Sequence, residues 1–451
     1  MPNSVLHDAV LHDAVLHDAA LDDAARQRPV VSGSDADRSF EQTVAAAKAA
    51  SHALAIATTD QKNHALAAIA SGIRDGGEAI VAANELDLAN GRENGLSTGL
   101  LDRLTLGIPR LSALADAVTE VIALADPVGT GVRASTLPNG VAIQQVRVPF
   151  GVVGTIYEAR PNVTIDIASL AIKSGNAVVL RGGSAALNTN RVLVEIIRRA
   201  LHEAGLPEDA VQTIDRFGRE GAGQLMRARG YVDVLIPRGS AELIATVVAE
   251  STVPVIETGA GVVHIVLDES AREDWAVEIV RNAKVQRPSV CNAVETVLVH
   301  SAAAQRLLPP VLAALRADDV TIHADERART IFPDSVPATE EDWATEYMSL
   351  DIAVAVVDSL DEAMAHIRRY STGHTESIIT NDLGNADRFL AEVDSAVVMV
   401  NASTRFTDGG EFGFGAEVGI STQKLHARGP MGLPELTSTK WIVRGSGQVR
   451  G

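Results

Sequence analysis

The sequence predicts an α/β protein with two parallel sheets, one formed before about residue 260 and one after it. Short apolar segments alternate with amphipathic ones from about residue 176 onward, which is the pattern of strands joined by crossover helices. The alternation resumes after residue 291, as expected for a second sheet. A chain of 451 residues with 46% hydrophobic and 22% charged residues can form two or three domains with large cores.

The first half of the chain begins with helices and then changes to strands. Three alanine-rich stretches carry apolar residues at helical spacing, and residues 141–148 and 151–156 have the composition of strands. An apolar strand, a glycine turn, a capping serine and a helix then follow one another, and this unit occurs twice. The expected helices span residues 40–55, 62–74, 78–90, 185–204 and 241–250, and the strands of the two units span residues 176–180 and 232–236.

The second half repeats the alternation with a different set of segments. Apolar runs of four to eight residues, typical of buried strands, are separated by amphipathic stretches of helical length. The expected strands span residues 293–300, 320–323, 351–357, 376–380 and 396–401. The expected helices span residues 273–284, 302–317, 360–370 and 386–393.

Acidic residues are in excess, with 58 Asp and Glu against 39 Lys and Arg and a net charge of −19. This charge repels nucleic acids and anionic membrane surfaces, so we expect neither as a partner. No apolar run reaches the length of about 18 residues that a membrane span needs. The N-terminus lacks the basic region and apolar core of a signal peptide, and a single cysteine fits a reducing compartment. We therefore expect a cytoplasmic protein.

A five-residue repeat, Val-Leu-His-Asp-Ala, begins at residues 5, 10 and 15. This period matches neither the helix nor the strand, so its leucines cannot form one continuous face. We expect residues 1–37 to be a disordered low-complexity extension. The same spacing turns His7, His12 and His17 away from one another on a helix, so we expect no metal site here.

Two glycine turns follow the strands of the repeated unit, at the carboxyl ends where parallel sheets bind ligands. Backbone N–H groups at the start of the next helix suit phosphate, and each turn adds an arginine. Both turns predict a phosphorylated cofactor, but for either turn alone an ordinary strand-to-helix connection stays an open alternative. A complete G-x-G-x-x-G motif after a strand is missing. The turns consist of Arg181, Gly182, Gly183 and Ser184, and of Arg238, Gly239 and Ser240.

Cys291 is the only cysteine, and its surroundings favour a catalytic thiol over a small buried filler. Pro288 ends the amphipathic helix at residues 273–284, so the thiol lies on an irregular segment that enters the second sheet. Arg287 and nearby backbone donors favour the reactive thiolate. We therefore expect Cys291 to be a nucleophile.

Five motifs carry a family resemblance. They are VPFGVVG at residues 148–154, YEARPNVT at 157–164, KSGN at 173–176, QRPSVCN at 286–292 and GAEVGISTQKLHARGPMGL at 415–433. In these motifs the chain resembles the gamma-glutamyl phosphate reductase family, also called glutamate-5-semialdehyde dehydrogenases, within the aldehyde dehydrogenase superfamily. The resemblance extends from about residue 38 to the C-terminus.

The resemblance implies an aldehyde-dehydrogenase-like fold, with two Rossmann-like parallel-sheet domains and a small oligomerisation element made from a hairpin and the C-terminal tail. It therefore also implies a homo-oligomer. The cofactor-binding domain would span residues 38–138 and 150–259, and the catalytic domain with Cys291 would span residues 260–410. The oligomerisation element would comprise residues 139–149 and 430–451.

The reaction that the resemblance implies is the NADPH-dependent reduction of L-glutamyl 5-phosphate to L-glutamate 5-semialdehyde and phosphate, the second step of proline biosynthesis. The Cys291 thiolate would attack the acyl carbon and expel phosphate, and hydride transfer to the thioester would give a thiohemiacetal that collapses to the aldehyde. The family also implies channelling of the substrate from glutamate 5-kinase.

Several site residues follow from the same resemblance. Asn162 matches the asparagine that donates to the reaction's oxyanion, with the Cys291 N–H as second donor, although a turn residue after Pro161 is the alternative. Arg181 matches a basic residue near the adenosine ribose, and Glu346 matches a glutamate that holds the nicotinamide ribose. The pair Gly239 and Ser240 matches the helix start beside the pyrophosphate.

Other residues are less directly tied to the family. Glu257 resembles the glutamate that activates water in hydrolytic aldehyde dehydrogenases, but a reductase needs no such water, so we expect a structural or wall role. His264 is expected either in the core or lining the site. Arg160 and Arg405 are candidates to bind the amino-acid end of the substrate.

Two alternative functions stay open. An aldehyde dehydrogenase could oxidise another aldehyde through Cys291 and Glu257, and its activity would not depend on phosphate. A non-catalytic homologue could use the N-terminal repeat as an interaction arm, and it would show no turnover with NADPH.

Overall fold

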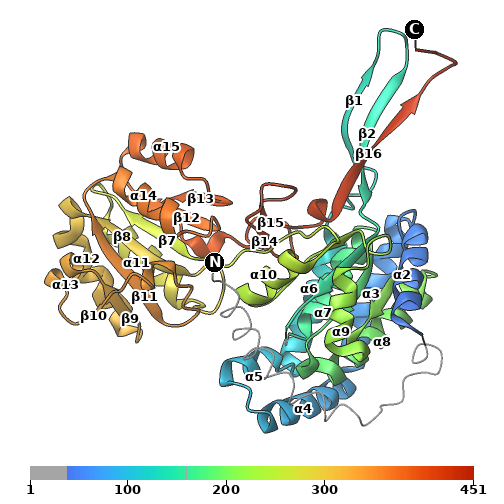
Figure 1. The fold of residues 1–451 in the computed structure, drawn as a ribbon, viewed down its shortest axis with the longest axis horizontal. Helices are drawn as coiled ribbons and strands as arrows, with labels where there is room; N and C mark the ends of the chain where they lie inside the picture. Colours follow the sequence, from blue (N-terminus) through green and yellow to red (C-terminus); the bar gives the residue numbers. More distant parts are fainter. Residues whose placement is uncertain (1–37, 159, 451) are drawn as a thin grey trace, which may run out of the picture. The chain divides into compact units, whose positions relative to one another are not determined.

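A parallel β-sheet forms the core of each of two units in the structure, a computed structural model that describes residues 38–158 and 160–450 (Figure 1). The first unit comprises the described part of Met1–Ile256 together with Phe414–Val418 and Gly432–Gly451. The second comprises Glu257–Gly413 and Gly419–Met431. The expectation of two parallel sheets is thus confirmed. The N-terminal repeat and its histidines lie outside the described residues.

The sheet of the first unit has four parallel strands in the order β5-β4-β3-β6. They span Val211–Thr213 (β5), Ala177–Arg181 (β4), Val152–Ile156 (β3) and Val234–Leu235 (β6). Strand β6 is shorter than the expected strand at residues 232–236. The N–H groups of Ile236 and Arg238 nevertheless donate to β3, so backbone pairing continues as far as the Arg238 turn.

Helices cover this sheet, and side-chain caps set the start of several of them. Ser39 and Thr58 form capping boxes, and Ser240 caps α10. The expected helix at residues 185–204 begins instead as a 3-10 turn, and α5, α6, α7 and α9 lie where no helix was expected. The helices are α2 (Phe40–Leu54), α3 (Thr59–Asp75), α4 (Gly77–Glu93), α5 (Thr98–Leu104), α6 (Ile108–Ala123), α7 (Asn162–Lys173), η2 (Ser184–Ala186), α8 (Leu187–Glu203), η3 (Glu208–Ala210), η4 (Asp215–Phe217), α9 (Gly218–Met226), α10 (Ala241–Glu250) and η7 (Pro434–Leu436).

A separate antiparallel sheet in the first unit consists of β1 (Gly131–Thr136), β2 (Ala142–Pro149) and β16 (Thr437–Arg444), in the order β1-β2-β16 (Figure 1). Residues 131–136 were expected in the cofactor-binding domain, but they pair with β2. The reason is a turn in which the Leu137 N–H donates to the Val141 carbonyl and Gly140 adopts a positive φ of 83°. The hairpin therefore begins before the expected boundary at residue 139.

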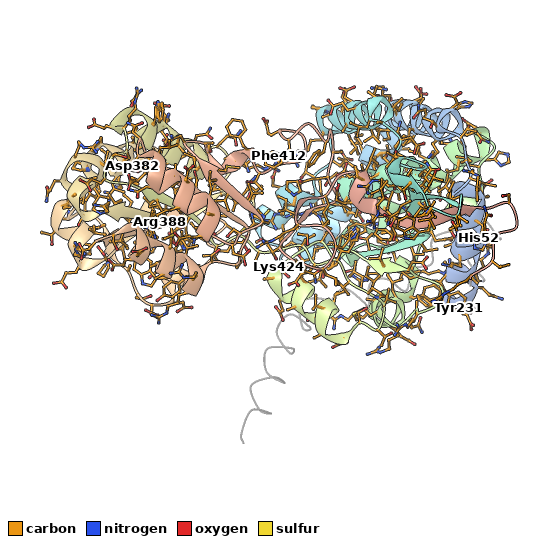
Figure 2. All side chains as sticks on the ribbon, turned by 90° about the horizontal axis from the view of Figure 1, so that it is seen from above. His52, Tyr231, Asp382, Arg388, Phe412 and Lys424 are labelled. Carbon is orange, nitrogen blue, oxygen red and sulfur yellow. The ribbon has the colours of Figure 1, made fainter. Side chains whose placement is uncertain are left out.

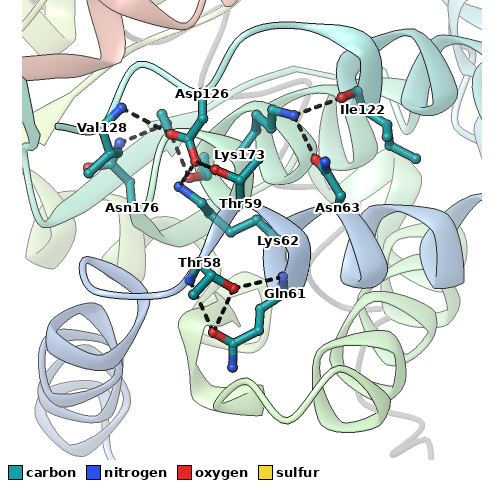
Figure 3. A network of polar contacts seen from close by, with 12 residues as sticks. Thr58, Thr59, Gln61, Lys62, Asn63, Ile122, Asp126, Val128, Lys173 and Asn176 are labelled. Carbon is teal, nitrogen blue, oxygen red and sulfur yellow. Dashed lines mark hydrogen bonds and ion pairs between the residues drawn. The ribbon is translucent and has the colours of Figure 1, made fainter. Parts of the chain in front are cut away.

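Two buried lysines join the helices of the first unit (Figure 3). Lys62 Nζ of α3 forms an ion pair with Asp126 Oδ2 at 2.5 Å, and the lysine side chain is 1% exposed. Lys173 Nζ of α7 donates to Asn63 Oδ1 at 2.6 Å and to the Ile122 carbonyl at 2.8 Å. These contacts connect α3 and α7 with the end of α6 and the segment after it.

The second unit is built on a seven-stranded parallel sheet in the order β10-β9-β11-β8-β7-β12-β13. Its strands are β7 (Val263–Leu267), β8 (Val294–His300), β9 (Thr321–Ala324), β10 (Val336–Pro337), β11 (Asp351–Val357), β12 (Thr375–Ile379) and β13 (Val397–Val400). Its helices are α11 (Glu273–Val285), α12 (Ser301–Ala317), α13 (Glu326–Ile331), η5 (Asp342–Ala344), α14 (Leu360–Tyr370), α15 (Leu383–Glu392) and η6 (Thr404–Phe406). A short antiparallel pair, β14 (Ile420–Ser421) and β15 (Gly429–Pro430), completes the unit.

Both faces of the seven-stranded sheet are covered by helices, which explains why its strands are rich in apolar residues. Along β7, Ile265 and Leu267 join the core formed with α11 and α12, whereas Val266 joins the core formed with α14 and α15. Successive side chains of a strand point to opposite faces, so a strand buried on both faces is mainly apolar. The buried polar side chains on these strands, such as His264, Glu295 and Glu376, have polar partners.

The outer surfaces of the helices are charged. Asp382 caps α15, and Arg388 lies on the same helix (Figure 2). Arg388 forms ion pairs with Asp361 and Glu392. Among the described residues, no helix combines the length and apolarity needed to cross a membrane.

Replacing Asp126 with alanine should destabilise the protein by about 3–5 kcal/mol, because the buried Lys62 ammonium would lose its counter-charge. Asp116→Ala is the matched control: the side chains of Asp116 and its partner Arg74 are 64% and 46% exposed. Its loss should cost at most about 1 kcal/mol. Urea unfolding followed by circular dichroism measures both changes. Equal losses for the two variants would contradict the stabilising role of the buried pair.

Candidate active site

The strand order of the second sheet brings four chain segments together at the amino-terminal ends of its strands. Strands β11, β8, β7 and β12 are neighbours and run parallel, so the segments that precede them enter the sheet side by side. These segments carry Glu346, Cys291, Gly261 and Thr372, respectively. The expected nucleophile Cys291 and the expected cofactor-binding residue Glu346 therefore lie at the same end of one sheet.

Gly261 packs directly on the peptide of Cys291. A Cβ atom at position 261 would lie 1.6 Å from the Cys291 carbonyl oxygen, so only glycine allows this approach. The Gly261 N–H donates to Glu346 Oε1 over 2.7 Å. The glycine segment thus connects the backbone of the partly buried Cys291 with the carboxylate of Glu346.

Thr372 fixes the same glycine segment from the other side. Its hydroxyl accepts a hydrogen bond from the Val262 N–H over 3.1 Å and donates to the Ala260 carbonyl over 2.5 Å. The backbone on both sides of Gly261 is therefore held by one side chain from the segment before β12.

Glu346 lies near a fully buried ion pair. Lys284 Nζ donates to Glu295 Oε2 over 2.6 Å, and neither side chain is exposed. Burial lowers the pKa of Lys284 and raises the pKa of Glu295 to about 7. Burial also raises the pKa of Glu346, while the Gly261 N–H and the charge of Lys284 favour its ionised form. Lys284 is therefore the cation that stabilises both carboxylates.

Hydrogen bonds connect the Cys291 loop and the preceding residues with η6 and Thr407. Asn292 Nδ2 donates to the Thr407 carbonyl over 2.8 Å, and the Thr404 hydroxyl donates to the Asn292 carbonyl over 2.7 Å. Arg405 Nε donates to Gln286 Oε1 over 2.7 Å. Burial is the main cause that lowers the pKa of Arg405. The charges of Arg287 and Cys291 also act on the Arg405 guanidinium. Arg405, a candidate for substrate binding, thus lies beside the Cys291 loop.

His264 lies in the core of the second unit. Its side chain on β7 is 0% exposed, and Glu376 Oε2 accepts from its N–H over 2.9 Å and contacts its Nδ1 at 3.1 Å. Its ring meets the ring of His366 on α14 edge-on. His264 therefore does not line a substrate surface, because it shares the inward face of β7 that α14 covers.

Glu257 is held by Gln423. The Gln423 side chain accepts from the Glu257 N–H over 3.0 Å and donates to Glu257 Oε2 over 3.2 Å. The Glu257 carboxylate is thus oriented by a neighbouring side chain.

In the first unit, the two predicted glycine turns follow β4 and β6, which both pair with β3, so they lie at the carboxyl-terminal ends of neighbouring strands. A Cβ atom on Gly182 would lie 2.2 Å from Asn190 Nδ2, so the turn requires glycine there. The Gly182 N–H donates to Asp215 Oδ1 over 2.7 Å, and burial raises the pKa of Asp215 to about 6. Arg181 Nε is buried and has no hydrogen-bond partner among the described residues.

The second turn already holds an anionic group. Glu158, which follows β3, accepts from the Ser240 N–H over 3.2 Å and from the Ser240 hydroxyl over 2.7 Å. Gly239 leaves room for this carboxylate, because a Cβ atom there would lie 2.8 Å from Glu158 Cδ. The N-terminus of α10 thus binds the carboxylate of Glu158.

Asn162 is the first residue of α7, and its side chain is oriented within the helix. Its Nδ2 donates to Asp166 Oδ2 over 2.9 Å. Burial raises the pKa of Asp166 to about 6, and the charge of Arg238 acts against this rise. Arg160 lies just before this helix, where its carbonyl accepts from the Val163 N–H.

Sequence reasoning did not find Glu158, Asp166, Asp215 or Asn292. Asp166 had a signal, since it lies four residues after Asn162 and so on the same helix face. Asp215 and Asn292 had none, because their partners are 33 and more than 100 residues away.

Comparison with known proteins shows the family of this chain. The sequence profile of the aldehyde dehydrogenase family matches residues 22–333. The gamma-glutamyl phosphate reductase of Leifsonia xyli subsp. xyli is 73% identical over 412 residues, which are 91% of this chain and 98% of that protein. This chain belongs to the gamma-glutamyl phosphate reductase family. The Thermobifida fusca reductase is 60% identical over 417 residues, covering 92% of this chain and 100% of that protein.

Solved structures support the fold assignment. The gamma-glutamyl phosphate reductase of Thermotoga maritima is 47% identical with a TM-score of 0.89, and the match covers 92% of this chain and 100% of that one. An acetylating aldehyde dehydrogenase from Geobacillus thermoglucosidasius shares the fold, with 16% identity, a TM-score of 0.67 and coverage of 91% and 97%. The aldehyde-dehydrogenase-like fold expected from the sequence is confirmed.

Gly261→Ala should lower kcat/KM of this reductase by about 10²-fold or more, because the new methyl group must displace the Cys291 peptide. Gly223→Ala is the matched control, since a Cβ atom there meets only the flexible end of Arg227 at 3.4 Å. Steady-state kinetics and melting temperature should be measured for both variants. Near-normal activity of Gly261→Ala would show that Cys291 does not depend on this contact.

Proposed function

We propose that this protein reduces L-glutamyl 5-phosphate to L-glutamate 5-semialdehyde and phosphate, with NADPH as cofactor, in proline biosynthesis. The high identity to curated reductases over nearly their whole length supports this substrate. The observation that carries the proposal is the position of Cys291, whose loop is bound on one side by Gly261 and on the other by η6. Such a loop holds a nucleophile in a fixed orientation.

Cys291 is the proposed nucleophile. Its thiolate attacks the acyl carbon, so that the C–S bond forms as the carbonyl π bond opens to give a tetrahedral oxyanion. The carbonyl then re-forms as the C–O bond to phosphate breaks, phosphate leaves with that electron pair, and the thioester remains. Asn162 and the Cys291 N–H are the proposed donors to the oxyanion. Arg405 is the proposed ligand for an anionic group of the substrate, because a guanidinium in the environment of Cys291 suits carboxylate or phosphate. Glu257, oriented by Gln423, is given no water-activating role.

The proposed NADPH site is at the carboxyl-terminal ends of the strands in the first sheet, where the start of α10 binds the Glu158 carboxylate in this structure. When bound, NADPH supplies the hydride that reduces the thioester. Arg181, with its unpartnered buried Nε, would attract the 2′-phosphate that distinguishes NADPH from NADH. Gly182, Gly183 and Ser184 would allow the close approach of the adenosine end, and Glu346 would hold the nicotinamide ribose. Arg238, Gly239 and Ser240 would hold the pyrophosphate.

A homo-oligomer joined through the β1-β2-β16 sheet is part of the proposal. The side chains of Val132, Trp441 and Val443 on this sheet are 50%, 49% and 62% exposed, which supports burial against another subunit. Channelling from glutamate 5-kinase stays a prediction from the family resemblance.

The purified protein should oxidise glutamate 5-semialdehyde with NADP only when inorganic phosphate is present, because phosphate must cleave the thioester in the reverse direction. Cys291→Ser should abolish this activity while NADPH binding persists, since a serine hydroxyl without a base is a far weaker nucleophile. NADP reduction followed at varied phosphate concentration, with NAD in parallel, measures both.

Phosphate-independent oxidation would instead favour the alternative aldehyde dehydrogenase that uses Glu257. Full retention of activity in Cys291→Ser would exclude covalent catalysis by this residue. Absence of any turnover in the wild type would favour the non-catalytic homologue.

Glu158→Gln should tighten NADPH binding by about tenfold or more. The reason is that the Glu158 carboxylate occupies the helix start proposed for the pyrophosphate, and two anions at one site repel each other. Glu242→Gln removes an exposed carboxylate from the first turn of the same helix and is the control. Isothermal titration calorimetry gives the Kd values. A Kd for Glu158→Gln that is unchanged or higher would place the pyrophosphate elsewhere.

A further inference from the structure

We propose that Asp166 is a positioning residue, which holds the Asn162 carboxamide with its NH2 group presented to the reaction's oxyanion. The inference rests on the proposed function, in which Asn162 is an oxyanion donor. It assigns a role to an acidic side chain that the catalytic steps above do not use.

The contact is local and well defined. Asn162 opens α7, and Asp166 lies four residues later on the same helix face. Asn162 Nδ2 donates to Asp166 Oδ2 over 2.9 Å, and both side chains are partly buried. Because α7 continues to Lys173 through residues that are almost all buried, the backbone that carries both side chains is fixed.

Hydrogen-bond chemistry makes the carboxylate selective. A carboxylate only accepts hydrogen bonds, so it binds the NH2 group of Asn162 and repels the Oδ1 atom. One N–H is used by Asp166, and the second N–H of the same group stays available to stabilise an oxyanion. Without the carboxylate, the carboxamide could rotate by half a turn and present Oδ1, which would repel the developing negative charge.

The electrostatic surroundings make this orientation depend on pH. Arg238, from the turn before α10, is the charged side chain that acts on Asp166 among the described residues, and it favours the carboxylate. Burial outweighs this effect and raises the pKa of Asp166 to about 6. Above that pH the carboxylate selects the NH2 group. Below it, the protonated acid can donate to Oδ1, and the preference is lost.

A double-mutant cycle tests the inference with the full-length enzyme in the phosphate-dependent assay. Asp166→Asn should lower kcat by about 10–10²-fold and leave KM nearly unchanged, since an amide at position 166 accepts either orientation of Asn162. In an Asn162→Ala background the same substitution should have little further effect. The melting temperature of Asp166→Asn at pH 8 should not fall, because an unfavourable buried charge is removed.

Additive effects of the two substitutions would overturn the inference, and so would an effect confined to KM, which would make Asp166 a ligand for the substrate's ammonium group. A readout independent of turnover is the NMR signal of the Asn162 NH2 group, identified by its absence in Asn162→Ala. This signal should titrate with a pKa near 6 in the wild type and not in Asp166→Asn. A flat signal in both proteins would also overturn the inference. If the wild type lacks phosphate-dependent turnover while the signal titrates as expected, the proposed function fails and the positioning contact stands.

Discussion

Parallel strand pairing decides where the functional residues of this protein lie. In the second unit, the chain enters four neighbouring strands at the same end of the sheet. Gly261 and Glu346 therefore form a hydrogen bond although 85 residues separate them. In the first unit, the turns that follow β4, β3 and β6 lie at the carboxyl-terminal ends of the strands of a smaller sheet. Each arrangement depends on buried, mainly apolar strands that helices cover.

Polar contacts then fix the segments that the sheets bring together. Single side chains each hold a neighbouring loop: the exposed Thr372 holds the glycine segment, the buried Asn292 holds η6, and the half-buried Asp215 holds Gly182. Charges are paired in the same way, with Lys284 between Glu295 and Glu346. These contacts restrict the loops to one geometry, which is the condition for precise covalent chemistry.

The sequence predicted the elements better than the contacts between them. The bounds of α10, α14 and β11 coincide with the expected ones, because apolar runs and caps are local signals. Helices α5, α6, α7, α9 and α13 were not expected. Neither was the early start of the hairpin at β1, because it depends on pairing with β2. Cys291 was recognisable as a lone thiol on an irregular segment, whereas its contact with Gly261 arises only through the sheet order. His264 could not be assigned, because its environment is set by Glu376 and α14.

The central claim is that Cys291 forms a thioester and releases phosphate before any reduction occurs. The most direct measurement is to mix the enzyme with L-glutamyl 5-phosphate without NADPH, to follow phosphate release, and to locate the modification by mass spectrometry. The account predicts a rapid burst of phosphate stoichiometric with enzyme subunits and a glutamyl group on the peptide that contains Cys291. Phosphate release without acylation of Cys291, or acylation of another residue, would contradict it.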